Sequence, residues 1–187
     1  VNGIATSPDG KLVATSSDED LVVLWEGGRL LRTFSGQISR RAFSPDGKTL
    51  HIFRDRQVVP FDVATGQPGK TRTFSARVLA VSCSDDGKVL VSLDNKRVHL
   101  CQGPNLVDLR LPFQVNLHAR FLIGASGRWA VGAPDGAEPA TAARLLDLTS
   151  GKLNTILFNE RVSDVDISPD DRFVAIGTDL ARVVVAR

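Results

Sequence analysis

The sequence predicts an all-β fold, a β-propeller, and two observations carry this prediction. A phrase of the type Ser-Pro-Asp-Gly-Lys returns five times along the 187 residues, with its glycine position at residues 10, 47, 87, 127 and 171. Short runs rich in β-branched and aromatic residues flank each copy. A period near 40 residues built on short strands is typical of propeller blades, because each small sheet can bury its faces only against neighbouring copies. We therefore expect one domain of five blades.

The five copies of the phrase set the repeat boundaries. The copies are Ser7–Lys11, Ser44–Lys48, Ser84–Lys88, the weaker Gly124–Arg128, and Ser168–Arg172. The predicted repeats are 1–36, 37–76, 77–116, 117–160 and 161–187. Residue types suited to tight bends make each copy a reversing turn between two strands.

Each repeat is expected to be a four-stranded antiparallel sheet. Alternation before the turn, as at Arg41 and Phe43 or Val81 and Cys83, predicts the first strand. The second strands are expected at Leu12–Thr15, Leu50–Phe53, Val89–Ser92, Trp129–Gly132 and Phe173–Ile176. The third strands are expected at Leu21–Trp25, Val58–Phe61, Arg97–Leu100, Arg144–Leu146 and Arg182–Val185. Glycine-bearing turns then lead to fourth strands such as Leu30–Phe34 and Leu153–Phe158, and the fifth repeat lacks this strand.

One residue disturbs this pattern. Pro60 lies in the third strand of the second repeat, where proline removes a ladder donor. We expect an irregular sheet there.

Composition narrows the classes of partner. The net charge of +2 and the pI near 8.8 are too mild for binding nucleic acid or a membrane by bulk charge. No apolar run approaches the roughly 18 residues of a membrane span. Cys83 and Cys101 are expected to be free thiols, and their spacing fits no zinc pattern. We expect no cofactor and a cytoplasmic location.

Motifs that could carry catalysis are weak. Ala64–Thr71 satisfies a relaxed phosphate-loop pattern, but Arg72–Phe74 after it reads as a strand, whereas a phosphate loop opens a helix. His51, His99 and His118 lack metal-ligand spacings, and no Gly-x-Ser-x-Gly nucleophile elbow occurs. Asp164 and Asp166 form an alternating pair that favours solvation over cation binding. We expect no enzymatic activity.

The repeat resembles a known family. Phe43–Lys48 followed by Phe61–Gly66 looks like a WD40 repeat, and Leu24-Trp25-Glu26 stands where that family has its Trp-Asp pair. The resemblance implies a propeller around a central channel that acts in scaffolding or peptide recognition. TolB-like propellers, which share the Ser-Pro-Asp-Gly phrase, are the second choice, because the Trp-Asp position becomes Leu100-Cys101, Leu146-Asp147 and Ala186-Arg187.

Closure of the ring is a separate question. The sequence stops after a third strand and opens directly on a first strand, so no terminal strand completes the last blade. We expect the chain to be part of a larger propeller, with a self-contained five-bladed ring as the alternative. In the first case the terminal blades expose apolar faces and an unpaired edge.

Charge on one face suggests a site. In an up-and-down blade, the turn after strand two and the loop before strand one emerge on the same face. Six basic residues of repeats two and three fall there and form the predicted partner-binding set: Arg40, Arg54, Arg56, Arg77, Lys96 and Arg97. Asp18, Glu19 and Asp20 make the equivalent turn of repeat one acidic. Arginine forks suit bidentate contacts, so we predict a protein or peptide partner that is acidic or phosphorylated.

Alternatives stay open at this point. Charged turns are ordinary, and the six residues could simply be solvated. Arg41, where other repeats have Ile or Val, could line a polar channel or pair with an acid, and the long turn 133–142 could carry specificity or none. The rival function is an enzyme or small-ligand propeller with its site at the central channel. A structural spacer is a third possibility.

Overall fold

The computed structural model describes residues 3–39, 41–94, 97–103, 105–109, 120–133, 141–168 and 170–186. In these ranges the chain forms strands β1 to β18, grouped into five antiparallel sheets. Each sheet is one blade, and its strands follow one another in chain order from the centre outward. The all-β propeller prediction is confirmed.

The strands of the five blades have the following bounds. The first blade consists of β1 (Gly3–Thr6), β2 (Leu12–Ser16), β3 (Leu21–Glu26) and β4 (Arg29–Ser35). The second consists of β5 (Thr49–Arg54), β6 (Gln57–Asp62) and β7 (Arg72–Thr73). The third consists of β8 (Val78–Cys83), β9 (Lys88–Leu93), β10 (Val98–Gln102) and β11 (Asn105–Leu109). The fourth consists of β12 (Arg120–Ile123), β13 (Trp129–Ala133), β14 (Ala142–Asp147) and β15 (Leu153–Leu157). The fifth consists of β16 (Val162–Ile167), β17 (Val174–Thr178) and β18 (Val183–Ala186).

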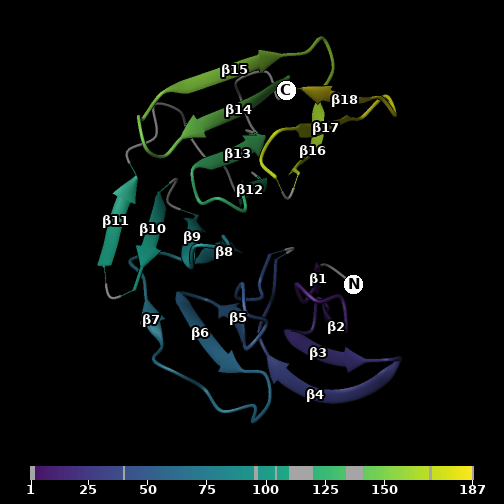
Figure 1. Ribbon diagram of the computed structural model, residues 1–187, viewed down its shortest axis with the longest axis vertical. Helices are drawn as coiled ribbons and strands as arrows, with labels where there is room; N and C mark the ends of the chain where they lie inside the picture. Colours follow the sequence, from purple (N-terminus) through teal and green to yellow (C-terminus); the bar gives the residue numbers. More distant parts are fainter. Residues whose placement is uncertain are drawn as a thin grey trace.

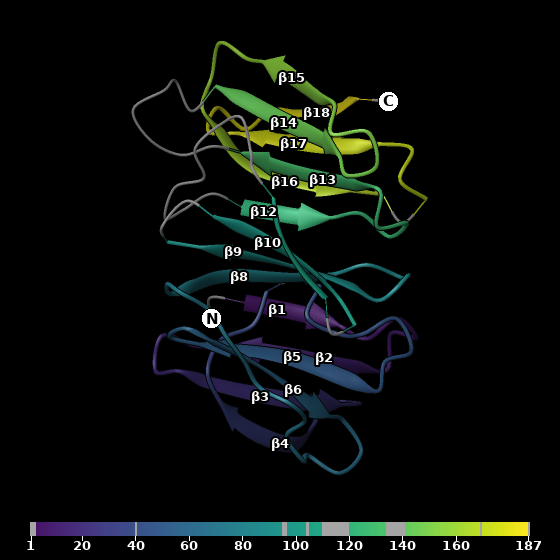
Figure 2. The ribbon, with the colours of Figure 1, turned by 90° about the vertical axis from the view of Figure 1, so that its left-hand side faces the viewer.

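The blades follow one another around an arc. Figure 1 shows this order from the purple first blade to the yellow fifth, and in the turned view of Figure 2 the third blade lies between the first two blades and the last two. The innermost strands touch from blade to blade: β5 contacts β8, β8 contacts β12, and β12 contacts β16. The first and fifth blades lie apart in both views.

The apolar core is divided among the interfaces between blades. Four clusters of buried residues occur, and each joins two consecutive blades. Leu24 of the first blade packs with Leu50 and Ile52 of the second, for example, and Val131 of the fourth packs with Val165 of the fifth. A blade is therefore stabilised by its neighbours, as the repeat pattern predicts.

The repeated turns share one backbone conformation. The residue at the glycine position has a positive φ in every copy, and in the four copies with glycine it ranges from 68° at Gly127 to 79° at Gly87. Asp171 occupies that position in the fifth copy and adopts φ 55°. Glycine, and less readily aspartate, tolerates this left-handed region, which explains why the phrase recurs.

The second blade departs from the four-stranded plan. The strand expected around Arg41 and Phe43 is wrong, since this segment makes only isolated bridges, Gln37 with Phe53 and Phe43 with Leu50. The segment bonds β5 at a few points only, and some of its polar groups bond the next blade. Cys83 N donates to Arg41 O at 2.8 Å, and Val81 N donates to Ser39 Oγ at 3.0 Å.

The irregularity expected at Pro60 is confirmed. His51, which faces Pro60 across the sheet, donates its N–H to Ala42 O on the inner side, so the ring nitrogen of Pro60 faces the outer side. Proline cannot donate there, and only Arg72 and Thr73 pair with β6 as strand β7. The outer edge of this blade is consequently short.

Both ends of the arc expose apolar side chains. Ile4 on β1 is 55% exposed, and Val183 and Val185 on β18 are 72% and 62% exposed. Strand β18 pairs with β17 alone, so it presents an open edge as well. The prediction that further blades belong to the ring stays a prediction, since outer strands of inner blades also expose apolar side chains, such as Val107 at 52% and Leu157 at 76%.

Candidate functional site

The structure brings the described members of the predicted set onto one face, which we call the basic face: the strand 2–3 turns and inter-blade loops that carry Arg54, Arg56, Arg77 and Arg97. Val78 N donates to Asp55 O at 2.7 Å, which seats the loop with Arg77 against the β5–β6 turn. Arg77 N donates to Asp94 Oδ1 at 3.1 Å, which ties the same loop to the β9–β10 turn. All four arginines are exposed.

Acidic neighbours partly balance this face. Arg54 Nε lies 4.0 Å from Asp20 Oδ2 of the first blade, and Arg56 Nε lies 3.8 Å from Asp55 Oδ2. Arg97 Nη1 lies 3.6 Å from Asp108 Oδ2 on β11. These arginine side chains are 57% to 64% exposed, so each pair contributes only about 0–1 kcal/mol. The acidic turn of the first blade therefore adjoins the basic turn of the second.

Three expectations fall outside the described residues. Arg40 and Lys96 belong to the predicted set but lie outside the described ranges, and so does most of the long turn, residues 134–140. Their roles stay predictions, as does partner binding by the four described arginines.

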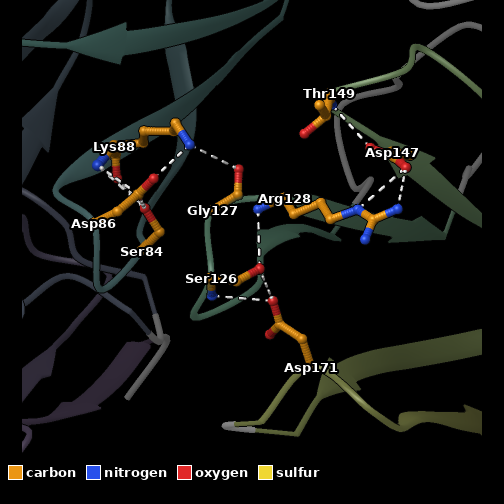
Figure 3. Close-up of polar contacts among 9 residues, drawn as sticks. All are labelled: Ser84, Asp86, Lys88, Ser126, Gly127, Arg128, Asp147, Thr149 and Asp171. Atoms are coloured by element: carbon orange, nitrogen blue, oxygen red, sulfur yellow. Dashed lines mark hydrogen bonds and ion pairs between the residues drawn. The ribbon is translucent and has the colours of Figure 1, made fainter.

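The opposite face, which we call the Gly-turn face, carries the strand 1–2 turns and holds a polar network between blades. The fourth turn has no aspartate of its own, and Asp171 of the fifth blade supplies one. Its carboxylate accepts hydrogen bonds from Ser126 N at 3.0 Å and from Ser126 Oγ (Figure 3). It also accepts one from Ala125 N at 2.8 Å. From the sequence alone, Gly124–Arg128 was identified only as a weaker copy of the Ser-Pro-Asp-Gly-Lys phrase, and the contribution of Asp171 was not predicted.

The third blade bonds the fourth turn from the other side. Asp85 N donates to Ala125 O at 2.7 Å. Lys88 Nζ donates to Gly127 O at 3.3 Å and also binds Asp86 (Figure 3). Hydrogen bonds at the fourth turn therefore connect the third, fourth and fifth blades. Their internal pairing favours a structural role over ligand binding.

An ion pair between the buried Asp147 and the exposed Arg128 lies at the degraded Trp-Asp position of the fourth repeat. Arg128 donates to Asp147 Oδ2 from Nε at 3.2 Å and from Nη2 at 2.9 Å, and Thr149 N donates to Oδ1 at 2.9 Å (Figure 3). The Arg128 guanidinium holds the pKa of Asp147 far below its ordinary value. Asp147 thus fixes the β14–β15 turn through its ionised form.

One thiol and one imidazole meet between the second and third blades. His51 Nδ1 lies 3.4 Å from Cys83 Sγ and 3.3 Å from Ala42 O. Burial lowers the pKa of His51, and burial raises the pKa of Cys83 to about 12. Both groups are therefore neutral near pH 7, and the pair is not an activated nucleophile and base. Cys83 and Cys101 are free and buried, as expected.

The other residues singled out in the sequence, Arg41, Asp164 and Asp166, form hydrogen bonds within the protein. Arg41 donates from Nη1 to Ile123 O at 3.3 Å, so it spans from the second blade to the fourth near the centre. Asp164 and Asp166 each accept the N–H of the following residue, at 2.9 and 2.8 Å. Within the described ranges, no group of three or more His, Cys, Asp or Glu is placed to hold a metal ion.

The phosphate-loop match is a turn between strands. Asp62 Oδ1 accepts hydrogen bonds from Thr65 N and Thr65 Oγ1, both at 2.7 Å, and the chain continues into β7 without a helix. The nucleotide-binding geometry is therefore missing from this described segment.

A pocket between the second and third blades was not predicted. It has a volume of about 670 Å³ and lies between β5 to β7 on one side and β9 to β11 on the other. Its lining includes Pro60, Arg72, Phe74, Val89 and Leu106. The sequence signal for it was Pro60, which shortens the outer edge of the second blade.

Comparison with known proteins agrees with this architecture. Residues 1–26 match the family described as WD domain, G-beta repeat, a stretch that ends with β3 and includes Leu24 and Trp25. No curated protein matches the chain. Among the described residues, we find no helix with the length and apolarity to cross a membrane. The described residues therefore form a β-propeller of five antiparallel blades whose first blade matches one WD repeat, and this architecture is consistent with the WD40-like family.

Proposed function

We propose that the chain is a non-catalytic interaction module that binds an acidic or phosphorylated protein or peptide on its basic face. WD40 propellers generally mediate protein interactions and are typically not enzymes. The family resemblance supports the general role in protein interaction, whereas the binding face and the charge of the partner are inferred from the residues of this chain. Free buried thiols suit the cytoplasm, which is the location we propose.

The observation that carries the proposal is the grouping of Arg54, Arg56 and Arg77 on turns that are bonded to one another. Their backbones belong to two packed blades, so the partner meets a surface that is already ordered. Binding then costs little loop-ordering entropy.

The loose pairing of these arginines supports exchange with a ligand. Arg54 and Arg56 approach their acids only to 4.0 and 3.8 Å, through Nε. The bonded pair Arg128–Asp147 lies at 2.9 Å by comparison. A ligand carboxylate or phosphate that offers shorter bidentate bonds can replace Asp20 or Asp55 at small cost.

The test measures binding of a fluorescein-labelled peptide of alternating Glu and Gly by polarisation, at low and at physiological salt. A phosphothreonine version of the peptide is measured in parallel. We expect saturable binding that weakens with salt, and the double variant R54E/R56E should weaken it by about tenfold or more.

The matched control is K11E/K48E, which makes the same change in net charge on the Gly-turn face. Lys11 and Lys48 are both exposed there. If both double variants lose the same affinity for the peptide, the effect comes from net charge and not from the basic face. Unchanged affinity in R54E/R56E would show that the basic face does not bind the peptide. The rival site at the central channel stays a prediction.

A further inference from the structure

The pocket between the second and third blades combines an apolar body with a cationic rim. We propose that it binds a small organic carboxylate with an apolar body, at a site separate from the basic face. The proposal does not depend on the proposed function.

The pocket exists because the second blade lacks a full outer strand. Pro60 offers no N–H on its outer side, and the chain from Pro68 to Lys70 is held only by a bridge at Phe61 and by Gly69 N donating to Pro60 O at 2.7 Å. Strand β7 therefore has two residues, while β11 of the next blade has five. The space that a longer strand and its side chains would fill is the pocket.

The charge of the lining favours an anion. Lys70 and Arg72 line the pocket together with His51, and the lining contains no Asp or Glu. Lys70 is exposed and makes no salt bridge to a described residue, and Arg72 donates to Gly103 O across the pocket. Asp86 precedes the lining residue Gly87, and its carboxylate accepts hydrogen bonds from Ser84 Oγ and Lys88 Nζ. A ligand anion at the rim would meet two cations and no opposing charge among these residues.

The rest of the lining favours an apolar body. It is formed by Val58, Pro60, Phe74, Val89, Val91, Cys101 and Leu106. Leu106 is 52% exposed, so apolar surface reaches the rim and would be covered by a ligand. The volume of about 670 Å³ lies within the roughly 300–1,000 Å³ of small-molecule sites. Burial of apolar surface supplies affinity, and the carboxylate supplies orientation.

None of the four described arginines of the basic face lines the pocket. The exposed lining residues Gly87 and Gly103 belong to the strand 1–2 and strand 3–4 turns of the third blade, at the opposite end of the strands from the turns with Arg56 and Arg97. The exposed lining residue Thr73 lies at the other end, where it pairs with Gln57.

The test uses 4-phenylbutyrate as the probe, with 4-phenylbutanol and 4-phenylbutylamine as neutral and cationic analogues. Binding is followed by amide chemical-shift changes in the whole chain. We expect saturable shifts centred on Lys70, Gly87, Gly103 and Leu106, and affinity about tenfold weaker for the alcohol and weaker still for the amine. Equal affinities for the three probes, or shifts located elsewhere, would overturn the proposal.

Two variants and a control complete the test. K70E should weaken phenylbutyrate binding by about tenfold, and V89W should block it by filling the pocket. K152E changes an exposed lysine in the corresponding turn of the fourth blade and should leave binding unchanged, as should R54E/R56E. Binding that survives both K70E and V89W in folded protein, as judged by circular dichroism, would refute the site.

The carboxylate could be free or could end a polypeptide. An acetyl-Gly-Gly-Phe peptide with a free C-terminus, compared with its amide, distinguishes these sources. Tighter binding of the peptide acid than of phenylbutyrate assigns the site to a protein C-terminus, and the reverse order assigns it to a small molecule. Failure of both acids to bind would reject the carboxylate chemistry itself.

Discussion

Two glycines of the fourth turn lie against aspartate side chains of the neighbouring blades and leave no space for a Cβ atom. A Cβ atom at Gly124 would lie 2.5 Å from Asp171 Oδ1, and one at Gly127 would overlap Asp86 Oδ1. The fourth copy of the repeated phrase is therefore not simply degraded. Its small residues leave room for carboxylates that come from both sides.

Gly127 should tolerate substitution less well than its equivalent in the third blade. Both have positive φ, 68° at Gly127 and 79° at Gly87, but a Cβ at Gly87 meets nothing within 4 Å. We expect G87A to cost about 1 kcal/mol of unfolding free energy from backbone conformation alone. G127A should cost roughly 2–4 kcal/mol, because it also displaces Asp86. Urea unfolding measures both, and equal costs would contradict the close approach.

The thiols should be inert in the folded chain. Burial raises the pKa of Cys83 to about 12 and also raises that of Cys101, so little thiolate forms at pH 8. We expect a disulfide reagent such as Ellman's to titrate neither thiol in native protein and both in 8 M urea. Rapid reaction of one thiol without denaturant would show that its interface between blades opens.

At the scale of the element, the repeated turn is held by a serine and an aspartate. Ser44 Oγ donates to Asp46 Oδ1 at 2.6 Å and accepts from Thr49 N at 2.9 Å. The same Ser-to-Asp bond occurs at Ser7 and at Ser168. The bond from Ser44, followed by that from Lys48 N, lowers the pKa of Asp46. The turns that keep this Ser-to-Asp bond are thus stabilised by an ionised carboxylate of their own.

The variant S44A tests this arrangement. Thr49 N loses its acceptor, so unfolding free energy at pH 7 should fall by about 1 kcal/mol. The pKa of Asp46 should rise toward its ordinary value of 3.8, while that of Asp9 in the first turn stays low. Because the folded pKa is depressed, this carboxylate stabilises the fold above the unfolded pKa and loses that effect as pH falls through the folded pKa. Titration of the Asp carboxyl carbons by NMR measures the pKa of Asp46 in S44A and in the unmodified chain. An Asp46 pKa that is the same in both would contradict the hydrogen bond from Ser44.

Local pattern was enough for most elements but not for all. The second and third strands of each repeat were predicted because alternation and β-branched residues are properties of the strand itself. The first strand of the second repeat was wrong, since this segment combines isolated bridges to β5 with bonds from β8 to Ser39 and Arg41 O, some 42 residues away in sequence. The pairing of Arg54 with Asp20 and the pocket beside Pro60 likewise depend on how blades meet. Periodicity within one repeat carries no information about such contacts.

At the scale of the whole molecule, stability is shared among the interfaces between blades. Each of the four apolar clusters belongs to two blades, so the arc is strongest inside and weakest at its ends. The end blades have one apolar neighbour each among the described residues. Their outer faces are where association with other protein surface is favoured.

The open end at β18 should therefore drive self-association. Val183 and Val185 present apolar surface beside an unpaired strand edge, which is a template for strand pairing. We expect the mass measured by light scattering to rise with concentration in the unmodified chain, and V183K/V185K to suppress this rise. Both side chains are exposed, so the unfolding free energy should change by no more than about 0.5 kcal/mol.

The control for this prediction is V107K/L157K, which adds the same charge to the outer strands of the third and fourth blades, away from the ends. Val107 is 52% exposed and Leu157 is 76% exposed. If association depends on the open end, the control should still associate, because charge on the outer strands leaves β18 uncovered. Equal suppression by both double variants would attribute association to general apolar surface. A mass of one chain at every concentration would show that the exposed end of the arc is stable alone.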